Sequence, residues 1–302
     1  MGKNIKAQKK DRSQSVFWQQ KWAYWHPVVN GVGIAVLFFS FGLLMIAIGS
    51  FFLISNSNLI DISLRYDDVC GDTPSTCELS FTLKEDVTDP INIYYGLTYF
   101  YQNHKEYMAS ISPAQLLGQD PSDSELELDC SPTDPIHYDP DSGDKTYDVP
   151  CGLIYQSQFN DTFTITNSGT LDVVTLSKTD IVPDVDKNER VSKDMRSTMG
   201  SNFEDAQVWA RPAALPKFRK LYRRIDDGLV AGTYSVSVSN NFPMEYQGAS
   251  KEFVVATVNS WGVKNSFLPL TSIVAGGISV LLAALGLVVE YCIPRSKRYD
   301  DL

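Results

Sequence analysis

Four cysteines lie in the middle of the chain, and their spacing suits oxidative chemistry. Cys70 and Cys77 are close together in the sequence, and so are Cys130 and Cys151. Four thiols in an oxidising compartment can all be paired, and they allow three pairings. Proximity in the sequence favours Cys70–Cys77 and Cys130–Cys151. Four buried free thiols or a metal site are the alternatives, but no Cys-x-x-Cys motif supports a metal.

A second modification site is indicated by Asn160-Asp161-Thr162, which is the chain's one Asn-x-Ser/Thr sequon. Such a sequon accepts an N-linked glycan when it is exposed in the secretory pathway. It lies, like the four cysteines, between two long uncharged runs at residues 28–54 and 267–289. We therefore predict glycosylation at Asn160. The fifth cysteine, Cys292, is predicted to be a free thiol, with palmitoylation as the alternative.

Catalytic and metal-binding motifs are not found. The chain has three histidines and contains neither His-Glu-x-x-His nor Gly-x-Ser-x-Gly. Asp184-x-Asp186-x-Asn188 begins like a calcium loop, but Glu189 and Met195 stand where that loop requires Gly and Glu. We therefore expect no catalytic residue, no metal and no cofactor.

Two long uncharged runs bracket this region. Residues 28–54 and 267–289 contain no Asp, Glu, Lys or Arg. As helices they would reach about 40 Å and about 34 Å, enough to cross a hydrocarbon core of about 30 Å. The sequence therefore predicts a segment at 1–27, a transmembrane helix at 28–54, a loop domain at 55–266, a second transmembrane helix at 267–289 and a tail at 290–302.

The charges around these spans predict their orientation. Residues 1–27 carry six basic and one acidic side chain, whereas residues 55–266 carry 17 basic and 32 acidic ones. Basic residues next to membrane helices favour the cytoplasm. Both termini are therefore predicted to be cytoplasmic and the domain lumenal or extracellular. Its acidic balance argues against a nucleic-acid partner.

The loop domain is predicted to be mainly antiparallel β. Alternating or β-branched runs predict strands at 60–66, 79–83, 91–101, 163–166, 171–176, 234–238 and 253–258. Short helices are predicted at 112–117, 195–201 and 215–225, and 118–150 is expected to be irregular. The predicted fold is a two-span α-helical membrane protein whose lumenal domain is sandwich-like, with two antiparallel sheets and short helices.

Small residues recur at helical spacing in both spans. Ala35, Gly42 and Gly49 mark the first span. In the second, the corresponding set is Ser272, Ala275, Gly276, Ser279, Ala283 and Gly286. Such stripes let helix backbones approach closely. They could pack the two spans together or receive the helices of a partner, and Ala275, Ser279 and Ala283 are therefore candidate partner contacts.

The aromatic run at 91–101 leads into a polar turn. Four of its side chains are predicted to be in the core, because large aromatic side chains dominate buried area: Tyr94, Tyr95, Phe100 and Tyr101. Asn103 and His104 follow them and are predicted to fix a loop by hydrogen bonds, and they are further candidates for contact with a partner.

Several ordered motifs resemble those of one known family, the cell-division-control-protein-50 or ligand-effect-modulator family. The resemblance covers nearly the whole chain. It is carried by Phe17-Trp-Gln-Gln20, Trp25-His-Pro27, Tyr94–Tyr107, Pro150-Cys151-Gly152, Phe159-Asn-Asp-Thr-Phe163, Val208-Trp-Ala-Arg211, Ala213–Tyr222, Asn240-Asn-Phe-Pro243 and Ser260-Trp261. The chain departs from the family pattern in its compact loop, in Tyr99 where an Asn is usual, and in the missing tryptophan of segment 179–188.

The resemblance implies a non-catalytic accessory subunit. Its expected partner is the catalytic subunit of a type-IV P-type ATPase, a phospholipid flippase, with which it would form a heterodimer in the bilayer. It would support folding of the ATPase, its exit from the endoplasmic reticulum and its activity. The expected location is a membrane of the secretory pathway: endoplasmic reticulum, Golgi, endosome or plasma membrane.

Two other classes of protein remain as alternatives. A subunit of a two-span ligand-gated channel would share the topology, but it would need polar pore positions and usually more lumenal cysteines. A lumenal enzyme is the third class, and the motif search weakens it. Purification separates the first two, because a channel subunit assembles with itself and an accessory subunit copurifies with a large ATPase.

Overall fold

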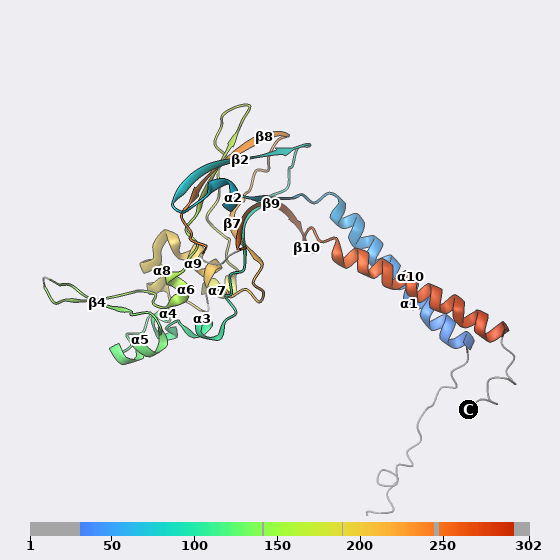
Figure 1. Ribbon diagram of the computed structural model, residues 1–302, viewed down its shortest axis with the longest axis horizontal. Helices are drawn as coiled ribbons and strands as arrows, with labels where there is room; N and C mark the ends of the chain where they lie inside the picture. Colours follow the sequence, from blue (N-terminus) through green and yellow to red (C-terminus); the bar gives the residue numbers. More distant parts are fainter. Residues whose placement is uncertain (1–30, 141, 189, 245–247, 293–302) are drawn as a thin grey trace, which may run out of the picture. The chain divides into compact units, whose positions relative to one another are not determined.

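The computed structural model describes residues 31–140, 142–188, 190–244 and 248–292 (Figure 1). The chain divides into a helical unit, made of residues 1–54 and 266–302, and a β-rich domain, made of Ser55–Asn265. The predicted cytoplasmic segment 1–27 lies outside the described residues, as does the tail beyond Cys292.

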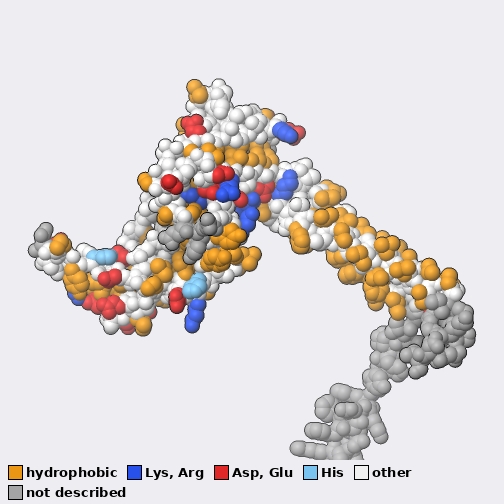
Figure 2. All heavy atoms as spheres, in the orientation of Figure 1, with side chains coloured by type: hydrophobic (Ala, Val, Ile, Leu, Met, Phe, Trp, Pro, Cys, Tyr) orange, Lys and Arg blue, Asp and Glu red, His pale blue; other side chains and the backbone are white. Residues whose placement is uncertain are grey.

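The helical unit consists of two long apolar helices, α1 (Gly31–Ser57) and α10 (Phe267–Cys292). Both are long and apolar enough to cross a membrane. Their outward side chains are large and hydrophobic, as the face in Figure 2 shows. A helix that exposes apolar side chains all round is suited to lipid rather than water. These are the two transmembrane helices that the sequence predicts.

The small residues lie where the two helices meet. The buried positions are Ala35, Gly42 and Gly49 in α1 and Pro269, Ser272, Gly276, Ser279 and Ala283 in α10. A Cβ added at Gly42 would lie 2.8 Å from the carbonyl oxygen of Gly276, so the backbones touch there. The stripes therefore pack the two spans against each other.

The β-rich domain contains two main antiparallel sheets. One has the order β1-β9-β3-β7, with β10 added to β9, and the other has the order β2-β8-β6. Their strands are β1 (Asp61–Arg65), β9 (Ser250–Asn259), β3 (Ile91–Thr98), β7 (Phe218–Ile225), β10 (Gly262–Val263), β2 (Ser75–Leu83), β8 (Gly232–Asn240) and β6 (Thr162–Asn167). A separate hairpin joins β4 (Ile136–Tyr138) and β5 (Lys145–Tyr147).

The alternation of the strands explains how the sheets pack. Along β8, Tyr234, Val236 and Val238 are buried while Thr233 and Ser237 are exposed. Successive side chains of a strand point to opposite faces, so one face of this sheet lies on the core and the other on solvent. The central strand β9 is buried along most of its length, as expected for a strand with partners on both sides.

Aromatic side chains fill the space between the sheets. Tyr95 of β3 stacks on Phe159 with ring centroids 3.9 Å apart, and Phe163 of β6 meets Phe253 of β9 at 5.0 Å. Trp209 is fully buried and contacts Phe100, Phe218 and Phe242. These contacts join both sheets into one core, which confirms the predicted sandwich-like fold.

Short helices occupy the connections. They are α2 (Asp67–Cys70), α3 (Lys105–Ala109), α4 (Pro113–Leu116), α5 (Asp123–Asp129), α6 (Leu153–Gln156), α7 (Asp184–Asn188), α8 (Lys193–Met199), the 3₁₀ turn η2 (Gly200–Asn202) and α9 (Phe203–Ala210). Serine begins several of them. The hydroxyls of Ser112 and Ser192 accept from the third residue of the following turn, and Ser122 forms a capping box with Glu125.

Three local predictions are wrong. Within residues 215–225, Phe218–Ile225 form strand β7 instead of a helix, because the side chains of Lys220 and Tyr222 alternate inward against the core. Residues 171–176 make only an isolated bridge, between Val173 and Thr166. The stretch 118–150 is more regular than predicted, since it holds α5 and the β4–β5 hairpin.

We predict that Gly276→Leu weakens the pairing of α1 and α10. A Cβ at Gly276 would lie 2.6 Å from Ile46 Cγ1 and 2.7 Å from the carbonyl oxygen of Gly42, so the helices must separate. Gly277→Leu is the matched control, since a Cβ there meets nothing within 4 Å. Thermal unfolding of the full chain in detergent should show a lower midpoint for the first variant only. Equal midpoints would contradict this packing.

Candidate functional site

A buried ion pair lies between the two sheets. Lys251 of β9 and Asp161, directly before β6, are almost fully buried, and Lys251 Nζ lies 2.8 Å from Asp161 Oδ2. The lysine also donates to the carbonyl oxygen of Phe242, at 2.7 Å, and to the side-chain oxygen of Asn240. The three N–H groups of the ammonium are thus all used.

Asp161 is equally well satisfied. Its Oδ2 also accepts from the hydroxyl of Tyr66 at 2.6 Å, and its Oδ1 accepts from the backbone N–H groups of Asn241 and Phe242, both at 2.5 Å. Charge-assisted bonds of this kind are the strongest that a carboxylate forms. This cluster of Lys251, Asp161, Tyr66 and Asn240, called the Lys251 cluster below, ties the ends of β6 and β8 to β1 and β9.

Burial shapes the electrostatics of the Lys251 cluster. Loss of solvation lowers the pKa of Lys251, and the neighbouring Asp161 carboxylate opposes that change. Burial, followed by the negative charge of Asp161, raises the pKa of Tyr66. The tyrosine therefore stays a protonated donor. The arrangement suits structural cross-linking better than proton transfer.

A second buried lysine closes the C-terminus of α9. Lys220 Nζ donates to the carbonyl oxygens of Val208, Trp209 and Arg211 at 3.0, 2.6 and 2.7 Å. A cation at this end of a helix satisfies free carbonyls and the helix dipole. Burial, with repulsion from Arg211, lowers the pKa of Lys220 to about 7. Instead of the helix predicted at 215–225, a strand, β7, buries this lysine.

The aromatic run ends in a turn fixed by amides. Gln102 is buried and spans from the N–H of Ala213 to the carbonyl oxygen of Trp209. Asn103 donates from Nδ2 to the carbonyl oxygen of Ala214 at 3.1 Å, as a loop-fixing residue should. His104 lies exposed directly before α3.

One residue of the predicted aromatic core, Tyr101, lies on the surface instead. Tyr95 is buried, Tyr94 is half-buried, and Tyr101 is 47% exposed. The strand β3 ends at Thr98, and beyond it the alternation that would turn Tyr101 inward is lost. Tyr101 is therefore a surface residue beside Asn103 and His104.

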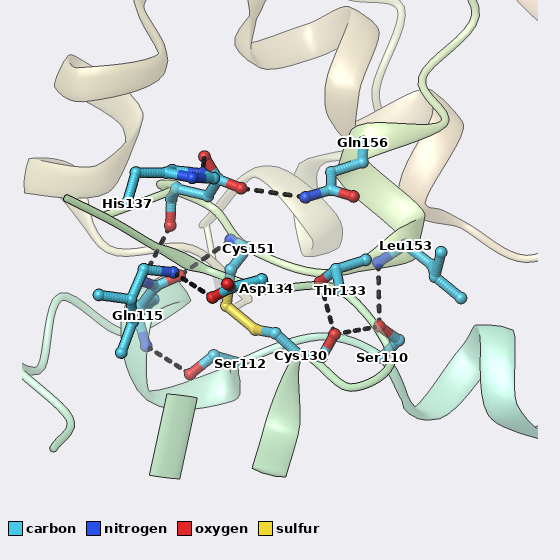
Figure 3. The surroundings of a disulfide bond; sticks show 12 residues. Ser110, Ser112, Gln115, Cys130, Thr133, Asp134, His137, Cys151, Leu153 and Gln156 are labelled. Carbon is cyan, nitrogen blue, oxygen red and sulfur yellow. Dashed lines mark hydrogen bonds and ion pairs between the residues drawn. A yellow bond between two sulfur atoms is a disulfide. The ribbon is translucent and has the colours of Figure 1, made fainter. Parts of the chain in front are cut away.

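The cysteines are joined in two disulfides, Cys70–Cys77 and Cys130–Cys151, and Cys292 is free and exposed. Hydrogen bonds enclose the second bridge (Figure 3). Ser110 donates to the carbonyl oxygen of Cys130 and accepts from the N–H of Leu153, and the side-chain oxygen of Gln115 accepts from the N–H of Cys151.

Glycine next to the second bridge is required by space. Gly152 has φ +105°, and a Cβ there would lie 2.1 Å from the carbonyl oxygen of Ser110. No side chain fits such a position. The Pro150-Cys151-Gly152 motif thus places the disulfide against the chain that precedes α4.

The sequon combines an exposed acceptor with a buried centre. Asn160 and Thr162 are exposed, whereas Asp161 between them is 2% exposed and belongs to the Lys251 cluster. No group of three His, Cys, Asp or Glu side chains that could hold a metal is found among the residues that the structure describes. The described part of this domain is cross-linked by two disulfides and by the buried ion pair.

The helical stripe has a defined position as well. Ser279 and Ala283 are buried on the side of α10 that packs on α1, and Ala275 is half-buried. Their first role is therefore within the chain.

Comparison with known proteins assigns this architecture to a family. The model of the LEM3 (ligand-effect modulator 3) family / CDC50 family matches residues 52–296. The chain belongs to the CDC50 family. It is 30% identical to cell cycle control protein 50A of Bos taurus, over 95% of this chain and 91% of that protein. It is 31% identical to cell cycle control protein 50C of Mus musculus (86% and 88%) and 29% identical to ALA-interacting subunit 3 of Arabidopsis thaliana (95% and 88%). The family resemblance noted in the sequence is thereby confirmed.

The motifs that carry the CDC50 resemblance meet in space. Phe159–Phe163 supplies Asp161, and Asn240–Pro243 supplies the two N–H groups that bind it. Val208–Arg211 supplies the carbonyl oxygens that hold Lys220. Lysine, aspartate and glutamine carry no periodic signal of their own, so the sequence pattern does not reveal the structural roles of Lys251, Asp161, Lys220 and Gln102.

We predict that Lys251→Met strongly destabilises the β-rich domain, because it leaves the Asp161 carboxylate buried without its cation. The expected loss in unfolding free energy is about 3–5 kcal/mol. Lys145→Met is the matched control: its partner is Asp123, and both side chains are 42% exposed. Exposed pairs contribute little to stability, because water and salt screen them. Denaturant unfolding measures both, and similar losses would contradict the role given to Lys251.

Proposed function

We propose that this protein is the non-catalytic accessory subunit of a type-IV P-type ATPase that moves phospholipid across a membrane. Family membership across residues 52–296 is the observation that carries the proposal. A relative similar over most of both chains is named an ALA-interacting subunit, which supports a role in binding a larger protein. The partner is the catalytic subunit, in a heterodimer.

The architecture supports a role in binding another membrane protein. Two apolar helices bury their small residues against each other and leave large hydrophobic side chains facing outward, where lipid or partner helices bind. The β-rich domain is held by two disulfides and the Lys251 cluster. A rigid body of this kind binds loops of a partner without a large ordering cost.

The effect of the subunit on the ATPase requires different affinities for the different conformations of the ATPase. A subunit changes the balance between conformations of its partner only when it binds them unequally. We place both termini in the cytoplasm and the β-rich domain in the lumen, where it contacts ATPase loops that move in the phosphorylation cycle. By this binding it assists folding of the ATPase, its exit from the endoplasmic reticulum and transport of phospholipid to the cytoplasmic leaflet.

Partner contacts are proposed on two surfaces. In the β-rich domain, the turn of Asn103 and His104 offers two exposed polar side chains, and the amide of Asn103 is held by its bond to the carbonyl oxygen of Ala214. In the membrane, Ala275 lies at the edge of the helix contact, while Ser279 and Ala283 contribute by holding α10 on α1.

We predict that the chain copurifies with a P-type ATPase, and that the ATPase expressed without it stays in the endoplasmic reticulum and forms less aspartyl phosphate. The purified chain alone should neither hydrolyse ATP nor move a fluorescent phospholipid in vesicles. ATP-dependent lipid movement without the ATPase would overturn the proposal. Assembly into a homomeric ring would favour the channel alternative instead.

Topology gives a separate prediction. In sealed microsomes, added protease should cut the terminal segments and spare residues 55–265. An endoglycosidase should increase the gel mobility of the wild-type chain, and Asn160→Gln should abolish that shift. The sequon's exposed Asn160 and Thr162 give the transferase access. A protected N-terminus would refute this orientation.

A further inference from the structure

A cavity of about 350 Å³ opens beside the sequon. Its apolar wall includes Tyr99, Phe100, Phe242 and Met244, and Asn160 stands in the same lining. Ligand sites in proteins are typically concave, mostly apolar and equipped with a few polar groups. The cavity thus has the size and lining to hold one small ring.

Tyr99 has an unusual backbone in this wall. Its φ is +60°, and its side chain is 47% exposed. A bulky residue in the left-handed region costs free energy that Asn or Gly would avoid, and such strain concentrates at functional sites. An exposed aromatic ring on a strained backbone therefore suggests that the ring forms part of a binding surface.

Asn160 is fixed at the rim of the cavity. Its carbonyl oxygen accepts from Nδ2 of Asn241, and the next residue, Asp161, is anchored in the Lys251 cluster. Among the described residues, the hydrogen bond of Asn160 is made by its backbone oxygen, and its side-chain amide makes none. Nδ2 of Asn160, the atom to which a glycan is attached, is therefore free of hydrogen bonds, while the backbone of Asn160 is held in place.

We propose that this cavity seats the first N-acetylglucosamine of a glycan on Asn160, with the sugar against the ring of Tyr99. Transfer from a lipid-diphosphate-linked oligosaccharide joins the anomeric carbon to Nδ2 and releases the lipid diphosphate and one amide proton. The inference rests on glycosylation of Asn160 and is independent of the proposed ATPase partner. The glycan then acts as part of the domain's packing.

The chemistry of the two cavities that Asn160 borders selects this one. The other is lined by Lys178, Asp205 and Arg223, whose charges favour water. A pyranose presents a face of C–H groups and an acetyl methyl, and these pack on aromatic and aliphatic walls. The positive edge of such C–H groups is attracted to the negative face of an aromatic ring.

A double-mutant cycle on the full chain, made in a eukaryotic secretory host, tests the proposal. Tyr99→Asn is combined with Thr162→Ala, which removes the glycan and keeps Asn160. Without glycan, Tyr99→Asn should raise the thermal midpoint by about 2–4 °C, because Asn tolerates the left-handed backbone. With glycan, the same change should lower the midpoint, because the sugar loses its wall. Coupling of this kind marks residues in contact.

Two controls make the result specific. Leu171→Asn, at φ +61° and 77% exposed, relieves similar backbone strain away from this cavity and should raise the midpoint equally with and without glycan. Trimming with an endoglycosidase that leaves the first sugar should preserve the coupling, whereas removing the whole glycan should abolish it. Additive effects of Tyr99→Asn and Thr162→Ala, or an unmodified Asn160 in the mature chain, would overturn the proposal.

Discussion

The β-rich domain depends on one buried charge pair, Lys251 with Asp161. Strand β9 brings the lysine into the buried space between the sheets, where the ammonium loses its solvation. Every polar atom of the pair must then find a partner, and the chain provides them from Tyr66, Asn240 and the backbone at Asn241–Phe242. The elements that supply these partners are far apart in sequence, so satisfying the charge fixes where each of them ends.

Such a pair is a weak source of stability, because taking two charges out of water offsets most of their attraction. Its stronger effect is on specificity. An aromatic core can repack in several ways at similar cost, whereas a lysine with three directed bonds accepts few arrangements. Lys220 acts in the same way at the C-terminus of α9, where its bonds to Trp209 and Arg211 set the angle of the helix on β7. A domain ordered in this way keeps one arrangement of its surface.

The sequence predicted features that rest on local pattern. Charge-free length predicted the spans, alternation predicted most strands, and spacing favoured the cysteine pairs that the structure contains. Predictions from the sequence were wrong where contacts between distant segments determine the secondary structure or the burial of a residue. Residues 215–225 have good helix formers, but the inward positions of β7 are filled by the aliphatic stem of Lys220 and the ring of Tyr222. Tyr101 was predicted to be buried because it is a large aromatic residue. It is exposed because β3 ends before it.

The candidate site was harder to predict than the fold for a related physical reason. Its residues are common types whose roles come from position, and Asp161 in particular sits inside a sequon that draws attention to its neighbours. Asn160 and Thr162 are exposed on either side of the buried Asp161, in the short segment that leads into β6. The bonds of Asp161 to Lys251 and to the backbone at Asn241 and Phe242 fix this segment. The contacts that anchor the segment between the sheets therefore also determine where the side chain of Asn160 meets solvent.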